Sequence, residues 1–488
     1  MLYRLVKFAL FLLAIGTITA NAHDIHECPV DFPEKPVIPG HIEQSDIVAG
    51  TYKFTELFEI GRELFGAQFN VCDGQGRPAT TGAGDARFPD QPNFIRTSSP
   101  DSNSCAGCHN APRFGGAGDF VANVFVLAQA LDPVTESVSA EFSNERNTLG
   151  MFGGGAIEML AREMTTDLQA QAGALGDGVH MLTSKGIDFA VEIDGGIVVA
   201  SSGIDTDLII KPFHQAGAVI SLREFTANAM NHHHGMQAEE RFDLNPAKGF
   251  DPDFDLDGVE RELTVGDITA VTLFQAALAV PGRRLPSDPA ERNEVKRGAT
   301  IFSAVGCASC HTPEMELESS LFAEPNPFNP DGTFSDTTQS FSFDLTKDGE
   351  KPRLERAIGG GAIVRAYTDL KRHNLCDDET RVDPIRLFCN EQLAQGRPEQ
   401  DGRPGAEFFL TRKLWDVGNS GPYGHRGDLT TITDAILMHG GEARASRDAF
   451  VGSPIEDQIA VIEFLKSLQV LPPNSPRVFV GECSGQDC

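Results

Sequence analysis

Cys105-Ala106-Gly107-Cys108-His109 and Cys307-Ala308-Ser309-Cys310-His311 are two copies of one five-residue pattern, and they decide the fold class of this 488-residue chain. In Cys-x-x-Cys-His, both cysteines can form thioethers with the vinyl groups of a haem, and the adjacent histidine coordinates the iron. A zinc or dithiol site would need a further Cys-x-x-Cys or histidine pair nearby. The sequence therefore predicts two covalently bound haem c groups. The residues that would hold them are Cys105, Cys108, His109, Cys307, Cys310 and His311.

The segments around the two motifs repeat in the same order. Upstream, Gly61–Phe65 matches Gly298–Phe302; downstream, Asp267–Leu278 aligns without gaps to Asp457–Leu468. Helix-type apolar spacing in these segments predicts a helix before and after each motif, and Ser453-Pro454 predicts an N-terminal cap for the last helix. A first and a last helix around Cys-x-x-Cys-His is the arrangement of the cytochrome c fold. We therefore expect a mainly α protein with two tandem cytochrome c-like haem domains.

The segments that do not repeat are long and rich in Gly, Pro and Asp, and we expect loop-rich insertions there, at 66–104, 112–210 and 316–410. The run from Pro281 to Pro289 has the composition of a linker. It divides an N-terminal haem domain, 23–285, from a C-terminal haem domain, 286–488.

A second pair of histidines accompanies the duplication. Pro212–Gly217 parallels Pro422–Gly427, and each is followed by a His-Gly-x-x-Ala pattern, beginning at His234 and at His439. Because each half already has its proximal histidine, these are natural sixth ligands of the irons. The prediction is that His439 pairs with His311 at haem 2, and that His234 is the displaceable distal ligand of haem 1.

Neighbouring side chains leave alternatives open. Met438 is a second candidate beside His439, and His232 and His233 share a short segment with His234. Because each helical residue turns by about 100°, only one of three consecutive histidines can point at a given iron.

The first residues predict export. Arg4 and Lys7 precede an apolar run, and Ala20-Asn21-Ala22 supplies a small-residue cleavage site, as in secretory signal peptides. We expect residues 1–22 to be removed and the mature protein to be periplasmic. It should have no membrane span, because no later stretch approaches the roughly 20 apolar residues required. The net charge of −30 argues against nucleic-acid binding and favours a basic electron-transfer partner.

Six cysteines lie outside the haem motifs, as expected for disulfides in an oxidising compartment. Their spacing suggests that Cys376 pairs with Cys389 and Cys483 with Cys488, which leaves Cys28 with Cys72. Sequence alone does not fix this pairing.

An acidic turn follows the histidine segment. Asp253, Asp255 and Asp257 precede Gly258 at the opening spacing of a calcium loop, but Thr264 stands where an EF-hand has glutamate. Calcium and a solvated acidic turn are both compatible with this sequence.

With these motifs in hand, the chain resembles the bacterial di-haem oxidoreductases related to di-haem cytochrome c peroxidases, most closely the peroxidase-like branch sometimes called thiol oxidoreductases. The stretches that carry the resemblance are Ser104–Arg113, Leu222–Glu239, Gly306–Pro313, Leu414–Gly427 and Ile436–Ala443. The chain departs from those peroxidases by having His439 in place of a methionine ligand. Its single tryptophan, Trp415, lies in the second half rather than the first.

The resemblance implies a peroxidase-like oxidoreductase. Haem 2 would take electrons from a small redox protein and pass them to haem 1, where peroxide or oxygen reacts. Such chemistry needs an acid/base residue beside the iron, and Glu158, in a glycine-rich segment, is the candidate, with Glu163 second. A solvated carboxylate at a helix start is the simpler interpretation of both. The alternative functions are a pure electron carrier with two six-coordinate haems and a haem oxygenase-type cleavage of an organic substrate.

Overall fold

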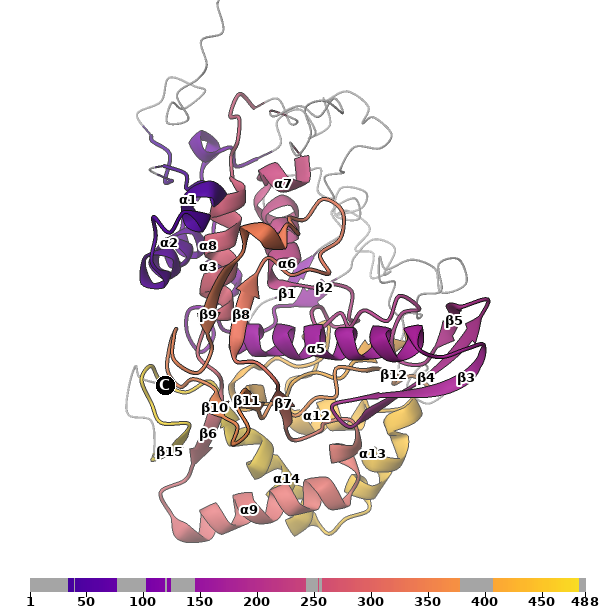
Figure 1. Cartoon of the computed structure of the whole chain (residues 1–488). Helices are drawn as coiled ribbons and strands as arrows, with labels where there is room; N and C mark the ends of the chain where they lie inside the picture. The colour runs from indigo at the N-terminus through magenta and orange to yellow at the C-terminus, as the bar shows by residue number, and fades with distance from the viewer. Residues whose placement is uncertain are drawn as a thin grey trace, which may run out of the picture.

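The computed structural model describes residues 34–38, 40–76, 102–118, 121–123, 145–242, 253, 257–377 and 407–481. This part of the chain is mixed and helix-rich, with six small sheets of two or three strands (Figure 1). The expected helices are present, but the expectation of a mainly α fold left out these sheets. Within the described residues, no helix is long and apolar enough to cross a membrane.

Two equivalent helix pairs form the repeated part of the fold. Helix α2 (Phe54–Gly66) packs against α8 (Val265–Ala276), and α9 (Pro289–Ala304) packs against α14 (Ile455–Lys466). In Figure 1 the first pair lies at the indigo end of the molecule and the second at the opposite end, beneath the remaining elements.

Glycines at matched positions allow the helices of each pair to touch. A Cβ at Gly61 would collide with the backbone carbonyl oxygen of Ala270, and a Cβ at Gly298 would collide with that of Ala460. Only glycine permits backbones to approach so closely. The helices predicted by the duplication therefore pair in the same register in both halves.

Matched pairs of phenylalanine rings lie where the helices of each pair cross. The ring centroids of Phe65 and Phe274 lie 5.2 Å apart, and those of Phe302 and Phe464 lie 5.4 Å apart. Each pair tilts its rings rather than stacking them, a favourable arrangement for aromatic quadrupoles. The same side chains thus fill the same places behind the two motifs.

The helix starts follow local chemistry, with one exception. Thr264 caps α8 in a complete capping box with Asp267, and Asp288 caps α9 ahead of Pro289. The cap predicted for α14 is wrong: its N-cap is Pro454, and the Ser453 hydroxyl donates to the carbonyl of Ala449.

The insertions contain more regular structure than expected. Helix α5 (Gly154–Gly173) crosses the middle of the molecule and leads into the antiparallel sheet β3 (Gly178–Ser184), β4 (Ile187–Asp194) and β5 (Ile197–Ser201) (Figure 1). Most of α5 is buried, so it belongs to the core rather than to a surface loop.

The third insertion, 316–410, builds short antiparallel pairings. Its strands are β7 (Met315–Leu317), β8 (Leu321–Glu324), β9 (Phe341–Asp344), β10 (Glu355–Arg356), β11 (Ala362–Val364), β12 (Arg372–Asn374) and β13 (Phe408–Leu410). They form the sheets β10–β11–β7, β8–β9 and β12–β13. A single hydrophobic cluster joins Leu273 and Ala276 of α8 to Phe322 and Phe343 of β8 and β9, so this insertion packs onto the first half of the chain.

The segment predicted as a linker forms a strand. Strand β6 (Gly282–Leu285) lies between β14 (Leu468–Gln469) and β15 (Val478–Val480), antiparallel to the first and parallel to the second. The remaining elements flank the motifs and the repeated turns. They are α1 (Gln44–Val48), α3 (Cys105–Cys108), β1 (Val121–Asn123), β2 (Glu145–Asn147), α6 (Leu222–Ala229), α7 (Glu239–Phe242), α12 (Ile432–Leu437) and α13 (Arg444–Val451).

Candidate functional site

A cavity opens at the second Cys-x-x-Cys-His motif. This second-motif cavity has a volume of about 280 Å³. His311 and His439 both line it, together with Cys307 and Cys310. Apolar side chains form much of the rest of the wall, among them Phe302, Leu414, Val461 and Leu465.

His311 and His439 are spaced as a pair of axial ligands would be. Their ring centroids lie 6.4 Å apart. Two imidazoles bound to one metal from opposite sides, with metal–nitrogen bonds of about 2.0–2.1 Å, would have centroids roughly 6.3 Å apart. The distance between the two rings therefore agrees with one iron held between them.

Hydrogen bonds orient both rings for that role. His311 Nδ1 lies 3.1 Å from the carbonyl oxygen of Tyr367, and His439 Nδ1 lies 2.8 Å from that of Ala435. An Nδ1–H bound to a carbonyl leaves Nε2 as the metal ligand. Burial, reinforced by His439, lowers the pKa of His311 to about 4, so the ring is neutral at pH 7 as a ligand must be.

The first-motif cavity is smaller, about 110 Å³, and includes Cys105, Cys108 and His109 in its lining. Its proximal side copies the second: the ring centroid of Phe65 lies 6.1 Å from that of His109, and the centroid of Phe302 lies 6.3 Å from that of His311. His109 Nδ1 lies 3.2 Å from the Gly116 carbonyl oxygen. The residues of both cavities thus fit a haem held by two cysteines and one histidine.

The distal sides of the two cavities differ. An isolated bridge joins Phe213 to Val219 in the first half and Tyr423 to Leu429 in the second. Directly after these turns, Ser221 caps α6 and Thr431 caps α12. The spacing from turn to cap is the same in both halves, so the register is fixed.

This register places Ala229, not His234, at the position of His439. Both Ala229 and His439 line their respective cavities. The alignment of His234 with His439 through His-Gly-x-x-Ala differs from this register by five residues, the length of the π-helix Met230–His234 that extends α6 where α12 ends.

The three consecutive histidines point to different surroundings. His234 is buried, with Nδ1 2.6 Å from the Ser102 carbonyl oxygen and Nε2 3.5 Å from Cys105 Sγ. His233 also lines the first-motif cavity, whereas His232 lines neither of the two motif cavities. The Ser102 carbonyl orients His234 through Nδ1, as carbonyls orient His311 and His439, and the remaining nitrogen, Nε2, faces Cys105.

His214 is a cavity residue that the sequence reasoning did not single out. It lines the first-motif cavity and has a φ of +65° where its counterpart Gly424 has +79°. A histidine in this left-handed region is strained, and such strain is concentrated at functional sites. Burial, with help from Arg146 and His233, lowers the pKa of His214 to about 4. Its match to a glycine in the repeat was the signal that could have found it.

Glu158, the predicted acid/base residue, lies in a buried ion network. Its carboxylate pairs with Arg162 and accepts hydrogen bonds from the Leu222 backbone N–H at 2.8 Å and from Asn326 at 2.9 Å. It does not line either motif cavity. Glu163 accepts from the backbone N–H of Glu318 and does not line them either. In this structure the contacts of Glu158 join α5, α6 and the segment at Asn326.

One thin wall separates the two cavities. Asn147, Thr148, Leu149 and Gln215 line both of them. The Asn147 backbone N–H donates to the His425 carbonyl oxygen at 2.9 Å, which ties this wall to the second half. The two motifs therefore face neighbouring spaces rather than separate regions of the molecule.

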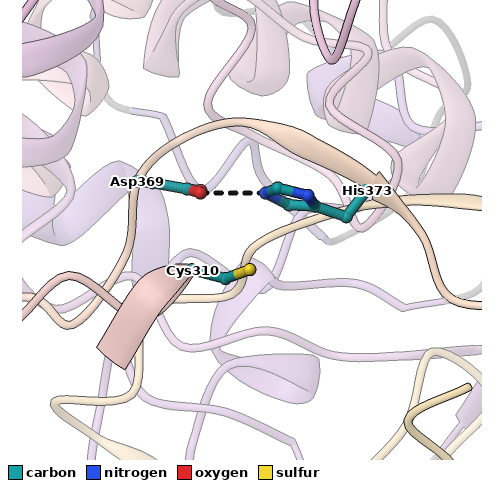
Figure 2. A group of neighbouring side chains, drawn as sticks. All are labelled: Cys310, Asp369 and His373. Carbon is teal, nitrogen blue, oxygen red and sulfur yellow. Dashed lines mark hydrogen bonds and ion pairs between the residues drawn. The ribbon is translucent and has the colours of Figure 1, made fainter. Parts of the chain in front are cut away.

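A third group of side chains lies beside the second motif (Figure 2). Cys310, Asp369 and His373 come close enough to hold a metal ion. His373 Nε2 is 2.9 Å from Asp369, and its Nδ1 is 2.8 Å from Glu442. Burial lowers the pKa of His373, but Asp369, Cys310 and Glu442 outweigh it and raise the pKa to about 11. The second motif already assigns Cys310 to a haem thioether, which leaves His373 paired with Asp369 and Glu442.

The cysteines divide as expected. Cys72 and Cys376 are in disulfides; their predicted partners, Cys28 and Cys389, lie outside the described residues, as do Cys483 and Cys488. The free cysteines of the described chain are the four motif cysteines.

The acidic turn is described only in part. Asp257 and Gly258 donate backbone N–H groups to Asp253, and burial, with Asp253 nearby, raises the pKa of Asp257 to about 6. Asp255 and residues 1–22 of the predicted signal peptide lie outside the described residues.

Comparisons with known proteins agree with the resemblance inferred from the motifs. No curated protein matches the chain. Among solved structures, hydrazine synthase from Kuenenia stuttgartiensis, pressurised with xenon, is 16% identical in sequence to this chain. The match covers 96% of this chain and 100% of that chain, with a TM-score of only 0.33. Residues 357–468 match the model of one family, which is described as di-haem oxidoreductase, putative peroxidase.

Proposed function

We propose that the protein is an exported di-haem c-type cytochrome that works as a peroxidase-like oxidoreductase. Electrons from a small redox protein would enter at the second-motif cavity and pass to the first-motif cavity, where peroxide or oxygen reacts. The observation that carries the proposal is the asymmetry of the two cavities: His439 lines one, and Ala229 stands at its register position in the other.

The second-motif cavity suits electron storage rather than catalysis. His311 and His439 fit both sides of one iron, which leaves no coordination position for a substrate. Two imidazoles also give a lower potential than a histidine and a methionine. The net charge of −30 would attract a basic donor protein to the surface.

The first-motif cavity suits reaction with a small oxidant. The methyl group of Ala229 cannot bind a metal, and His234 is engaged by Ser102 and Cys105. A haem in each cavity would supply the one-electron and peroxide or oxygen chemistry.

His214 replaces Glu158 as the proposed acid/base residue. Its lowered pKa, about 4, leaves the ring neutral at pH 7, so that one ring nitrogen can accept a proton from a bound peroxide and return it to a leaving oxygen. Arg146 lines the same cavity and would stabilise negative charge there.

Azide titration of the oxidised, doubly haem-loaded protein tests the proposal. The expected result is one azide per two haems, with peroxide turnover when a reduced donor is supplied. A pure electron carrier would bind no azide before or after one-electron reduction, and that outcome would reject the enzyme. Cleavage of an organic substrate with oxygen, without peroxide turnover, would favour the oxygenase alternative.

A further inference from the structure

Two cations, the buried Lys413 and the half-buried Arg412, lie between the haem motifs. Arg412 and Lys413 line the second-motif cavity and also a third, middle cavity of about 50 Å³. His109 of the first motif lines this middle cavity as well. The two cations are therefore placed where both haem-binding regions can be reached.

Packing from both halves holds this segment in place. Asp416 Oδ2 would lie 2.7 Å from a Cβ at Gly150, and the Trp415 ring would collide with a Cβ at Gly153. Arg412 makes a long contact of 3.5 Å with the Gly150 carbonyl oxygen. The backbone from Arg412 to Asp416 is thus fixed against residues of the first half.

The charges around this segment do not balance. Lys413 Nζ binds Asp416 at 2.6 Å, and both side chains are at most 8% exposed. Arg412 also interacts electrostatically with Asp416, so one buried carboxylate offsets the charge of two cations. Among the described residues that line the middle cavity, none is a carboxylate.

An excess buried positive charge is costly unless an anion compensates it. Burial lowers the pKa of Lys413 to about 8 and lowers that of Arg412, which shows the direction of this cost. The second-motif cavity offers one other acid, Glu442, which is engaged by His373. The environment therefore favours a carboxylate ligand that this chain does not itself supply.

We propose that Arg412 and Lys413 form a carboxylate-binding pair for the propionate groups of the haem at the second motif. The proposal rests on the proposed function only in requiring haem there. Arginine is suited to bidentate binding of a carboxylate, and lysine adds a point charge. By offsetting the propionate charge, the pair raises the reduction potential of that haem.

Spectroelectrochemical titration of the haem-loaded protein tests this role with a readout independent of turnover. Arg412→Gln and Lys413→Gln are each expected to lower the midpoint potential of the low-spin haem, and the double variant to lower it further, because the uncompensated propionate stabilises the ferric state. Lys413→Arg keeps the charge and should keep the wild-type potential. Lys466→Gln, which removes an exposed lysine paired with Glu463, is the matched control.

Two further measurements separate the alternatives. Mass spectrometry under denaturing conditions verifies that each variant keeps two covalent haems. Wild-type protein without covalent haems would contradict both the proposed function and the carboxylate-binding pair. Variants that keep two haems but show unshifted midpoint potentials would contradict only the carboxylate-binding pair. Sodium acetate, against chloride of equal ionic strength, should not change the wild-type potential. A saturable acetate shift that disappears in Lys413→Gln would assign the pair to a soluble carboxylate and overturn the haem assignment.

Discussion

The identity of one side chain distinguishes the two cavities. His439 approaches His311 at a ring-centroid distance of 6.4 Å, while the matched position of the first half carries Ala229. A ligand at one register position and a methyl group at the other would give one closed and one open iron from the same local fold.

Exchanging the second-motif ligand should change the potential of its haem. His439→Met is expected to raise the midpoint potential by on the order of 0.1 V, within the roughly 0.8 V that axial ligands span, while the haem stays low-spin. Redox titration followed by visible spectra measures this. An unchanged potential would remove His439 as the ligand and turn attention to Met438.

His234 should not control the spin state of the first haem in the resting protein. Because its ring is engaged by Ser102 and Cys105, His234→Ala is expected to leave the oxidised spectrum unchanged and to lower the melting temperature. His232→Ala, on the same π-helix but outside both motif cavities, is the control. A change from low-spin to high-spin on mutating His234 would restore the displaceable ligand predicted from the sequence.

The proximal ligands could be read from the sequence, because Cys-x-x-Cys-His fixes chemistry within five residues. The distal side could not. Its geometry depends on where α6 ends, and a π-helix of five residues shifted a His-Gly-x-x-Ala pattern that resembles the other half only in composition. The prediction for Glu158 failed to place it in a cavity for a related reason. Its glycine-rich segment predicts close approach of the backbone to a cofactor, but in the structure the backbone at Gly155 approaches helix α8 instead.

At the scale of elements, the glycine contacts make the helix pairs sensitive to a single methyl group. At Gly298 in α9, the methyl group of alanine would meet the Ala460 carbonyl, and overpacking of this kind costs about 1–3 kcal/mol. Gly298→Ala and Gly61→Ala should therefore lower the free energy of unfolding, measured by chemical denaturation of the haem-loaded protein.

Gly173, at the end of α5, provides the control for this prediction. A Cβ there meets nothing within 4 Å, so Gly173→Ala should be neutral or stabilising by up to about 1 kcal/mol. Equal losses at Gly173 and Gly298 would contradict the close-approach explanation.

The repeated helices were predictable because the same apolar spacing occurs in both halves, so each copy supports the assignment of the other. The inserted strands β7 to β13 were not, because strands of two to four residues leave no alternation to detect, whereas β3 and β4, with seven and eight residues, carry an alternation of burial that could have been detected. Strand β6 was hidden in a Pro- and Gly-rich run, since its partners β14 and β15 lie almost 200 residues away in the chain.

At the scale of the molecule, a buried ion network joins the third insertion, 316–410, to the first half. Arg223 of α6 bonds Glu240 of α7 and Glu324 of β8, and Glu158 lies beside them. Burial and the nearby charge of Glu158 raise the pKa of Glu324 to about 7, although the charge of Arg223 acts to lower it. The folded protein therefore keeps a proton on Glu324 that the unfolded chain releases near its ordinary pKa of 4.5.

This difference predicts how stability depends on pH. Between pH 4.5 and 7 the folded state binds more protons at Glu324, so its stabilising contribution is present at low pH and is lost as pH rises through about 7. Glu324→Gln should reduce the loss between pH 5 and 8 by on the order of 1–3 kcal/mol. Urea denaturation at both pH values measures it, and Glu318→Gln, at an exposed carboxylate, is the control. Identical pH dependence in all three proteins would contradict this role.

The central claim is that the chain holds one closed and one open haem iron, and electron paramagnetic resonance of the oxidised, haem-loaded protein tests it most directly. The account predicts equal amounts of a low-spin and a high-spin ferric signal in the wild type. Ala229→His, which copies His439 into the first half, should convert the high-spin signal to low-spin, and His439→Ala should convert the low-spin signal to high-spin. A wild-type spectrum with two low-spin haems, unchanged by Ala229→His, would contradict the account.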